Sequence, residues 1–386
     1  MEKIKEFFKH IIFNFFDTFY CLFGQNKVII LIEKSNYTND LETELLRRAK
    51  FYFVDNNVSF IVLKVSKKNV YKYIFTASIK VTYGFDFKNK FFKYNQGKLL
   101  FFDVDYNQNP DDGWQWHHAL EKYTYKSESI NKAVDRSLGN FKHYLSTIPK
   151  YDKAYIIGTG PSLSKAGEID WSDGYRIVCN TIVKDSEMWK HVNPHFIVAG
   201  DAIYHFGSND FALSFIEDLK KRLRESDTYF IYPFYFHPYV KRVLEEFDEK
   251  LIPIPTVQRD FIHNSLLFDF RIPDDIGNVL NLLLLPLACT LSKKVYLFGF
   301  DGRAPNDKLF WSNSSKHTYE DKLGEIIKQH PKFFEHNVPK QGETKYVNNV
   351  HGERLENILS IAEKANWSFV MMHKSWTETL NKRFEN

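Results

Sequence analysis

Cysteine is scarce in this sequence. Its 386 residues include only Cys21, Cys179 and Cys289, which are widely spaced and odd in number. A disulfide framework needs paired cysteines and a zinc site needs closely spaced ligands, so we expect neither. Three isolated cysteines fit a protein of a reducing compartment.

Long apolar runs are also missing. No segment reaches the roughly 18 uninterrupted apolar residues of a membrane-spanning helix. Asp17 interrupts the first candidate, and the run from Leu280 to Leu291 is too short. The N-terminal apolar stretch lacks the small-residue cleavage site of a signal peptide. We therefore expect a cytoplasmic protein.

The sequence has no large excess of charge of one sign. Lysine and arginine number 52, aspartate and glutamate number 48, and the formal net charge is +4. This balance argues against a duplex-binding surface, so we expect no nucleic-acid partner. The hydrophobic content of 44% excludes a disordered chain and suffices for two modest domains or one large domain.

Aromatic residues are abundant instead, at 17% of the chain, and they cluster within residues 1–24. At about 100° per residue, all the aromatic side chains of this segment except Phe13 and Tyr20 fall on one half of a helix. Lysines enrich its first turns. This pattern is typical of a helix in a membrane interface, here peripheral on the inner face of the cytoplasmic membrane. A helix packed on the protein's own core, or a contact in a homo-oligomer, explains the pattern equally well.

The pattern of residues 25–113 predicts a small N-terminal α/β domain. It ends in a loop-rich segment, Asn-Gln-Asn-Pro-Asp-Asp-Gly, at residues 107–113. We expect strands at residues 28–32, 59–65 and 99–104 and a helix at 41–50.

Residues 114–386 predict a second, larger α/β domain. After a helical stretch over 114–145, strand-like runs alternate with longer helical runs. The expected strands are 154–157, 175–179, 196–198, 229–232, 295–298 and 369–371, and the expected helices are 211–225, 240–250, 279–291 and 353–366. Such alternation is typical of a Rossmann-like, mostly parallel sheet, in which ligands bind at the carboxyl ends of the strands.

A glycine-rich turn, Gly158-Thr159-Gly160-Pro161-Ser162, follows the first of these strands. Its glycines allow a close backbone approach and its exposed amides favour an anion, so the turn is a candidate phosphate site. It is neither a Walker A loop nor a full dinucleotide fingerprint. An ordinary strand-to-helix turn is the alternative.

Three further strands end in small or polar residues. Directly after them stand Asn180 with Thr181, Asp201, and Gly299 with Asp301. An Asn or Asp at such a place binds a ribose, a sugar hydroxyl or a metal in some proteins, and forms a turn or caps a helix in others. The recurrence of these endings favours a site.

In order and spelling, these motifs resemble the bacterial lipooligosaccharide sialyltransferases, which transfer N-acetylneuraminic acid from CMP-sialic acid. That family has a Gly-x-Gly-Pro-Ser loop like residues 158–162, an Arg-Cys-Asn-type strand end like 178–180, and a Tyr-Leu-x-Gly-x-Asp strand like 296–301. A histidine precedes its last helix and strand, as His351 does here. The resemblance covers about residues 151–375.

The resemblance implies a sialyltransferase-like, GT-A-type variant of the Rossmann-like fold and no metal cofactor. The family's Arg-x-Thr-Ser-Gly segment is not matched cleanly, and Gly277-Asn278 is the nearest equivalent. The residues expected at the nucleotide sugar are Gly158, Thr159, Gly160, Ser162, Asn180, Thr181, Asp201, Gly277, Asn278, Gly299, Asp301 and Trp311.

His351 corresponds to the family's general base, which draws a proton from the acceptor hydroxyl. An imidazole titrates near neutrality and suits that task independently of the resemblance. Where the family has tyrosines that assist the leaving phosphate, this chain has Arg303 and Phe310-Trp311. Arg303 could neutralise phosphate charge instead, and a different donor sugar is an equal alternative. The long polar stretch 303–347 is expected to form a lid.

Together these features predict an inverting glycosyltransferase that moves sialic acid or a similar acidic sugar from a CMP-sugar donor to a surface glycan or glycolipid acceptor. One alternative is a Mg²⁺-dependent pterin-type pyrophosphokinase, since a family of that activity shares the Gly-x-Gly-Pro-Ser loop. Asp201 and Asp301 would then hold the metal. Another alternative is a non-catalytic nucleotide-binding accessory protein of the flagellar or glycan machinery.

Overall fold

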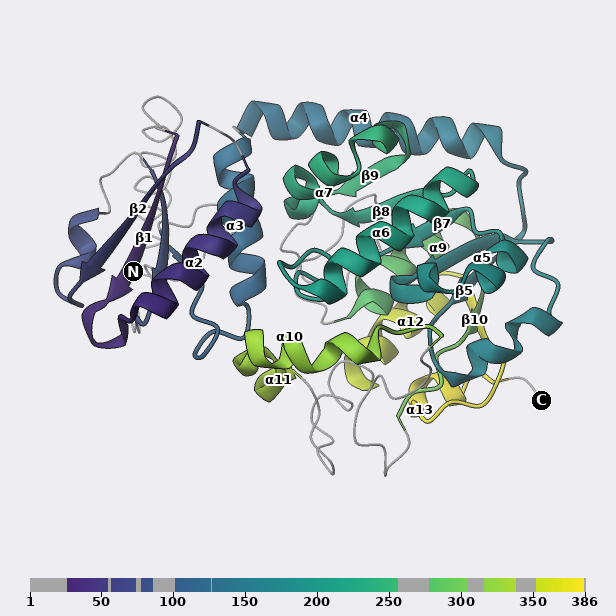
Figure 1. Ribbon diagram of the computed structural model, residues 1–386. Helices are drawn as coiled ribbons and strands as arrows, with labels where there is room; N and C mark the ends of the chain where they lie inside the picture. The colour runs from purple at the N-terminus through teal and green to yellow at the C-terminus, as the bar shows by residue number, and fades with distance from the viewer. Residues whose placement is uncertain are drawn as a thin grey trace, which may run out of the picture. The chain divides into compact units, whose positions relative to one another are not determined.

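The computed structural model describes residues 26–54, 57–73, 78–85, 101–125, 127–255, 278–303, 316–337 and 352–384. The chain divides into two compact units. Unit 1 runs up to Ile130 and includes His330–Phe333, and unit 2 comprises Asn131–Gln329 and the residues from Phe334 on. Each unit is built on its own parallel sheet (Figure 1). The segment predicted as an amphipathic helix, residues 1–24, lies outside the described residues.

Unit 1 contains a four-stranded sheet in the order β2-β1-β3-β4. Its elements are β1 (Lys27–Glu33), α2 (Asn39–Tyr52), β2 (Ser59–Val65), β3 (Ile79–Tyr83), β4 (Phe102–Asp103) and α3 (Asp112–Thr124), with 3-10 helices at Lys34–Asn36 and Val70–Tyr73. Strand β1 is buried from Val28 to its end, as a central strand with both faces covered requires. The predicted strands at 28–32 and 59–65 and the helix at 41–50 are confirmed.

Unit 2 contains a seven-stranded sheet in the order β11-β10-β5-β6-β7-β8-β9, and every neighbouring pair is parallel. The strands are β5 (Lys153–Ile157), β6 (Tyr175–Cys179), β7 (Phe196–Val198), β8 (Tyr229–Pro233), β9 (Leu251–Ile254), β10 (Lys294–Phe298) and β11 (Ser368–Met371). The fold class is therefore α/β with two parallel sheets. All six strands predicted for this region are confirmed.

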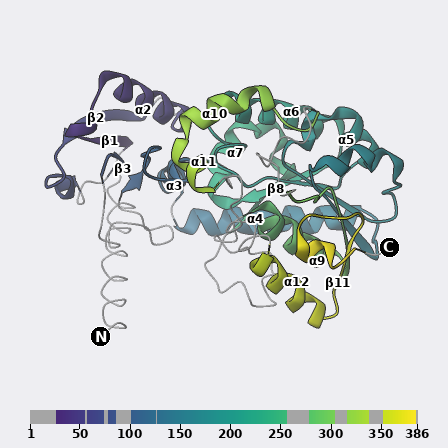
Figure 2. The same ribbon diagram turned by 90° about the horizontal axis from the view of Figure 1, so that it is seen from below.

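Helices cover both faces of the larger sheet, with α5 and α6 on one side and α4, α9 and α12 on the other (Figure 2). The α-helices from residue 127 on are α4 (Ser127–Thr147), α5 (Ser186–Val192), α6 (Asp210–Glu225), α7 (His237–Val243), α9 (Leu285–Leu291), α10 (Leu323–Gln329), α11 (Pro331–Asn337), α12 (Leu355–Lys364) and α13 (Glu378–Asn381). The 3-10 helices are Pro161–Glu168, Asn180–Lys184, Phe234–Phe236, Glu245–Lys250 and Glu320–Lys322, and a π-helix covers Leu280–Leu284. No helix among the described residues is long and apolar enough to cross a membrane.

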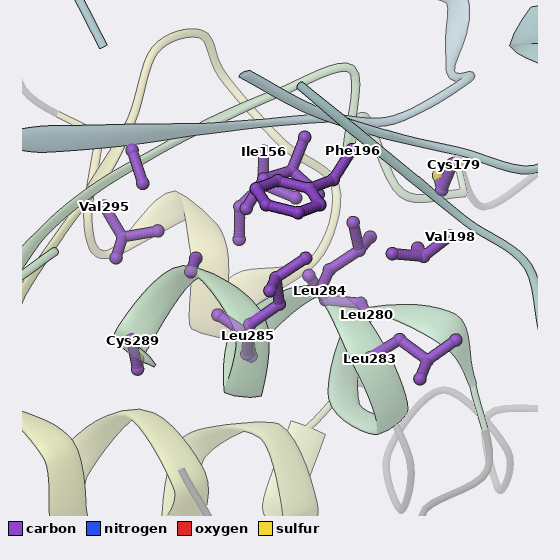
Figure 3. Close-up of a cluster of buried hydrophobic side chains, with 14 of the residues drawn as sticks. Ile156, Cys179, Phe196, Val198, Leu280, Leu283, Leu284, Leu285, Cys289 and Val295 are labelled. Atoms are coloured by element: carbon purple, nitrogen blue, oxygen red, sulfur yellow. The ribbon is translucent and has the colours of Figure 1, made fainter. Parts of the chain in front are cut away.

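The core of unit 2 lies between the sheet and the helical segment that ends in α9. Ile156, Phe196 and Val295 on the strands face Leu284 and Leu285 (Figure 3). All five are fully buried, so this contact removes a large apolar area from water and holds the helices against the sheet.

Two strands were not predicted, each because a residue interrupts its apolar pattern. Strand β3 contains Lys80 and Thr82, which are both buried. Strand β9 contains Pro253, which has no N–H for a sheet hydrogen bond. Since β9 is an edge strand, it tolerates the missing donor.

The sequence was less accurate for the helices. The single stretch predicted over 114–145 is two helices, α3 and α4. The expected helix at 240–250 is α7 followed by the 3-10 helix Glu245–Lys250, and the one at 279–291 begins as a π-helix ahead of Pro286, which cannot donate a helical hydrogen bond. Helices α10 and α11 lie within the predicted lid, where no periodicity was visible because each has only seven residues.

Candidate functional site

The larger sheet has a switch point at β5. From β5 the sheet extends through β6 to β9 on one side, and through β10 and β11 on the other. Ligands of open parallel sheets bind at such a point, outside the carboxyl ends of the strands. Strands β5 and β10 are neighbours and end at Ile157 and Phe298. The loops that carry Gly158 and Gly299 therefore meet at this edge.

Glycine allows these two loops to pack backbone against backbone. The Gly158 N–H donates to the Phe298 carbonyl oxygen at 2.7 Å, and the Gly160 N–H donates to the Gly299 carbonyl oxygen at 2.9 Å. A Cβ on Gly158 would lie 2.6 Å from the Gly299 carbonyl oxygen, which is too close for any side chain. Gly299 has φ +77°, in the left-handed region that favours glycine. The glycines thus make the contact between the loops possible.

The carboxylate of Asp301 lies where the sequence predicted a phosphate. It accepts the Ser162 N–H, 3.2 Å from each carboxylate oxygen, and the Ser162 hydroxyl at 2.8 Å. This places a negative charge at the first turn of the 3-10 helix Pro161–Glu168, where free N–H groups favour an anion. The sequence predicted a phosphate at the exposed amides of the turn formed by residues 158–162, whereas in the structure the N–H groups of Gly158, Gly160 and Ser162 donate to protein acceptors.

His373 belongs to the same group of side chains. Its Nε2 lies 2.8 Å from the Ser162 hydroxyl oxygen and accepts the Gly299 N–H at 2.9 Å. Its Nδ1 is 2.8 Å from the Lys374 carbonyl oxygen. Since Nε2 accepts an amide N–H, this hydrogen-bond network assigns the ring proton to Nδ1, which donates to Lys374.

Ser162, Asp301 and His373 form one polar cluster, hereafter the Ser162–Asp301–His373 cluster. Its members follow three adjacent strands, β5, β10 and β11. The side chains of Asp301 and His373 are each 18% exposed, so a ligand can reach them. The sequence analysis missed His373, although it comes two residues after β11 and fits the rule that singled out Asn180 and Asp301.

Asn180 is the most unusual residue at the next strand end. It adopts a left-handed conformation with φ 53°, which is strained for a residue with a side chain. Its Oδ1 is buried and accepts no hydrogen bond from the part of the chain that is described. Strain and an unsatisfied acceptor at one residue are typical of binding sites.

Thr181, in contrast, has a structural contact. Its hydroxyl donates to the carbonyl oxygen of His317, and the nearby Lys184 ammonium donates to the carbonyl oxygen of Thr318 at 2.6 Å. The ring of His317 contacts Asp185, with Nε2 3.1 Å from Oδ2. The Thr181 side chain therefore anchors the segment around His317.

Asp201 caps the turn that follows β7. Its Oδ1 accepts the N–H groups of Ile203 and Tyr204, each at 2.8 Å. Burial raises the pKa of Asp201 to about 6, although these two hydrogen bonds lower it. His205 lies beside it and accepts the Asp201 N–H at 3.2 Å, and burial lowers the pKa of His205 to about 3. Asp201 Oδ1 therefore acts as a cap, which was the alternative to ligand binding.

The remaining predicted residues lie apart from the cluster or outside the description. The Asn278 Oδ1, just before the π-helix, accepts the Asn281 N–H at 2.9 Å. Thr159 and Arg303 are partly exposed, on the loops after β5 and β10. The residues outside the described part of the chain are Gly277, Trp311 and His351. Within the described ranges, no group of three or more His, Cys, Asp or Glu side chains could hold a metal ion.

No protein-family model, curated protein or solved structure matches this chain. The likeness to the sialyltransferases therefore rests on the sequence motifs alone. What the described residues add is the placement of those motifs: the Gly158 and Gly299 loops meet at the switch point, with Asn180 on the next strand.

Proposed function

We propose that this chain is a glycosyltransferase that uses a CMP-activated acidic sugar, bound at the carboxyl edge of the seven-stranded sheet. The observation that carries the proposal is the switch point between β5 and β10, where the Gly158 and Gly299 loops lie together. The buried Oδ1 of Asn180 supports it, because a nucleotide N–H or O–H group would supply the missing donor.

The proposed reaction is one inverting displacement at the anomeric carbon. The acceptor hydroxyl oxygen forms a bond to that carbon as the bond from the carbon to the CMP phosphate oxygen breaks. His351 takes the hydroxyl proton, and CMP leaves with the bonding electron pair. Arg303, on the loop after β10, would neutralise part of the phosphate charge.

The acceptor in this proposal is a surface glycan or a lipid-linked oligosaccharide. Support comes from residues 1–24, whose aromatic half and lysine-rich first turns suit a membrane interface. Deletion of residues 1–24 should release the protein from sedimented membranes. Unchanged sedimentation would remove the membrane-bound acceptor from the proposal.

A thermal-shift panel tests the donor. We expect CMP and CMP-sugars to raise the melting temperature, and CDP, UDP, GDP and ATP to leave it nearly unchanged, because ligands that bind only the folded state stabilise it. A shift with ATP and Mg²⁺ alone would instead indicate the pyrophosphokinase reaction.

The base is tested by His351→Ala in a transfer assay with a CMP-sugar. Loss of general-base catalysis should lower the rate by about 10²- to 10⁴-fold without abolishing donor binding. His143→Ala, on the exposed face of α4, is the matched control and should keep the full rate. Transfer by His351→Ala at the unaltered rate would refute the assignment, and binding without any turnover would favour the non-catalytic alternative.

A further inference from the structure

The Ser162–Asp301–His373 cluster has more hydrogen-bond acceptors than donors. The described residues direct three hydrogens to it, from the Ser162 N–H, the Ser162 hydroxyl and the Gly299 N–H. A carboxylate alone accepts about four hydrogen bonds and the Ser162 oxygen can accept as well, whereas the one lone pair of the His373 Nε2 is taken by the Gly299 N–H. The Ser162 hydroxyl oxygen lies 2.8 Å from both Asp301 Oδ2 and His373 Nε2, and its single hydrogen is donated to Asp301. This cluster can therefore accept further N–H or O–H groups.

A phosphate fits this position poorly. Phosphate oxygens are acceptors with negative charge, and the carboxylate of Asp301 would repel them. Three of the loop amides, those of Gly158, Gly160 and Ser162, already donate within the protein. A group with hydroxyls, such as a ribose or a pyranose, matches the cluster because it brings donors and no charge.

An exposed aromatic side chain lies on the loop beside the cluster. Trp376 is 64% exposed, and the other large hydrophobic side chains exposed in the described ranges are aliphatic. Its backbone is fixed to the loop of Asp301, because the Trp376 N–H donates to the Asp301 carbonyl oxygen at 2.7 Å. The neighbouring Ser375 hydroxyl donates to the Phe300 carbonyl oxygen at 2.7 Å. The loop that is hydrogen-bonded to the Asp301 loop thus presents an indole to solvent.

We propose that the Ser162–Asp301–His373 cluster and Trp376 form a subsite for a hydroxyl-bearing ring, either the ribose of the nucleotide or the sugar of the donor. Asp301 and the Ser162 oxygen accept hydrogen bonds from the ring hydroxyls, and Trp376 packs on an apolar face of the ligand. The subsite rests on the proposed function, since it binds one part of the proposed donor. The sequence predicted a phosphate at the Gly158–Ser162 loop, whereas this subsite binds a hydroxyl-bearing ring.

Calorimetric titration of the full chain tests the subsite with two variants. Asp301→Asn keeps an oxygen for the Ser162 N–H but removes the charge, and Trp376→Ala removes the indole without touching the core. We expect Asp301→Asn to weaken the binding of CMP-sialic acid by about 10- to 100-fold, because hydrogen bonds to a charged group are the strong ones, and Trp376→Ala to weaken it by up to about tenfold, because an aromatic contact is lost. Asp173→Asn, a surface carboxylate of the same unit with 58% of its side chain exposed, should bind as the unmodified chain does.

Deoxygenated ligands identify the ring. If the ribose occupies the subsite, 2′,3′-dideoxy-CMP should bind about tenfold or more weakly than CMP, and Asp301→Asn should weaken CMP but not the dideoxy analogue. If the donor sugar occupies it, Asp301→Asn should weaken CMP-sialic acid and leave CMP unaffected. Either pattern supports the subsite.

Other outcomes overturn it. If Asp301→Asn and Trp376→Ala bind CMP and CMP-sialic acid with the same affinities as the unmodified chain does, the cluster is structural only. Pyrophosphate binding that is competitive with CMP and is strengthened by Asp301→Asn would restore the phosphate assignment. If no CMP compound binds the unmodified chain at all, the proposed function fails first, and this result is distinct from binding that ignores the variants. Should Asp301→Asn fail to fold, Trp376→Ala decides alone.

Discussion

The two units contain the same kind of sheet but differ in how their strand ends treat polar groups. Both sheets are parallel. In each sheet the order of the strands reverses once, between β1 and β3 in unit 1 and between β5 and β10 in unit 2. At the edge of unit 1, Glu33 accepts the Ser35 N–H at 2.8 Å. Asp105 accepts the N–H groups of Gly84 and Asn107, each at 3.0 Å. Glu33 stabilises its own loop, and Asp105 links the loops that follow β3 and β4.

At the carboxyl edge of the sheet in unit 2, some hydrogen-bond acceptors have no donor among the described residues. Asn180 has a buried oxygen without a donor in the described part of the chain, and the Ser162–Asp301–His373 cluster has fewer donors than acceptors. Since both units share the architecture, the sheet itself does not define a site. The difference lies in how the polar residues after the strands are grouped: the cluster of unit 2 joins side chains that follow three adjacent strands, whereas the Glu33 carboxylate takes both of its donors from Ser35 alone.

The largest effect is expected from the buried charges of unit 1. The Arg48 side chain is 2% exposed and lies 3.3 Å from the fully buried carboxylate of Asp112, which also contacts His330 Nδ1 at 2.8 Å. Arg48→Met would remove the cation and should lower the free energy of unfolding by about 3–5 kcal/mol. Urea denaturation followed by circular dichroism measures the change.

The neighbouring arginine provides the control for this variant. Arg47 forms an exposed pair with Glu44, and Arg47→Met should cost about 1 kcal/mol or less. If unit 1 is structural, folded Arg48→Met should bind CMP as the unmodified chain does. Weakened CMP binding by folded Arg48→Met would contradict a purely structural role of unit 1.

The contact between the two glycine loops should give the next largest effect. Gly299→Ala forces a side chain into the left-handed region and against the backbone of Gly158, at a cost of about 1–3 kcal/mol or more. We expect a lower melting temperature together with weaker CMP binding. Gly167→Ala, where a Cβ would have no neighbour within 4 Å, should change neither. Equal effects of the two variants would contradict the loop contact.

Asp201 should produce a pH-dependent effect. Burial raises its pKa to about 6 from an ordinary 3.8, so the folded state holds the proton more tightly than the unfolded state does. Stability from this group is present near pH 4 and is lost as the pH rises through about 6. Asp201→Asn, which keeps a capping oxygen, should therefore be more stable than the unmodified chain at pH 7, by on the order of 2 kcal/mol, and equal to it near pH 4.

Asp170 provides a control of opposite sign. Its exposed carboxylate accepts the Ser172 N–H, which lowers its pKa. Its contribution is present above its ordinary pKa and is lost as the pH falls, so Asp170→Asn should be slightly less stable at pH 7. Thermal melts at several pH values measure both variants. A stability gap for Asp201→Asn that does not change between pH 4 and 7 would contradict the raised pKa.

The smallest effect on stability is expected at Asn180. Asn180→Gly relieves the left-handed strain and should raise stability by about 0.5–1 kcal/mol while weakening CMP binding. Asn193, with φ 46° at the end of α5, is the matched control. Asn193→Gly should give a similar gain in melting temperature with unchanged binding. Equal binding by both variants would remove Asn180 from the site.

Much of the fold could be predicted because its strands are short, apolar and followed by glycine or polar residues. The runs that became β5, β6, β7, β8, β10 and β11 are each short and mostly apolar, as burial on both faces requires, and β5, β6 and β10 are followed directly by glycine or asparagine. Strands β3 and β9 were missed because Lys80 and Pro253 break the pattern, and only the sheet order shows that Pro253 lies on an edge strand, which tolerates its missing N–H.

The candidate site was predicted only in part. The strand-end rule located Ser162 and Asp301, but it could not show that Asp301 would contact Ser162 across 139 residues of chain. It assigned the loop amides to a ligand because a sequence does not reveal which acceptors the fold brings near them. His373 was not predicted, although it also follows a strand, β11, and the strand-end rule applies to it.

By itself, the sequence determined the α/β class, the positions of most strands and the polar residues that follow them, since these depend on local patterns of apolar and turn-forming residues. The strand order, the switch point at β5 and the partners of each polar group depended on the tertiary structure. Hydrogen bonds between residues distant in sequence decide whether a carboxylate is satisfied or is left to accept a ligand. For that reason, the contrast between unit 1 and unit 2 became visible only in the folded chain.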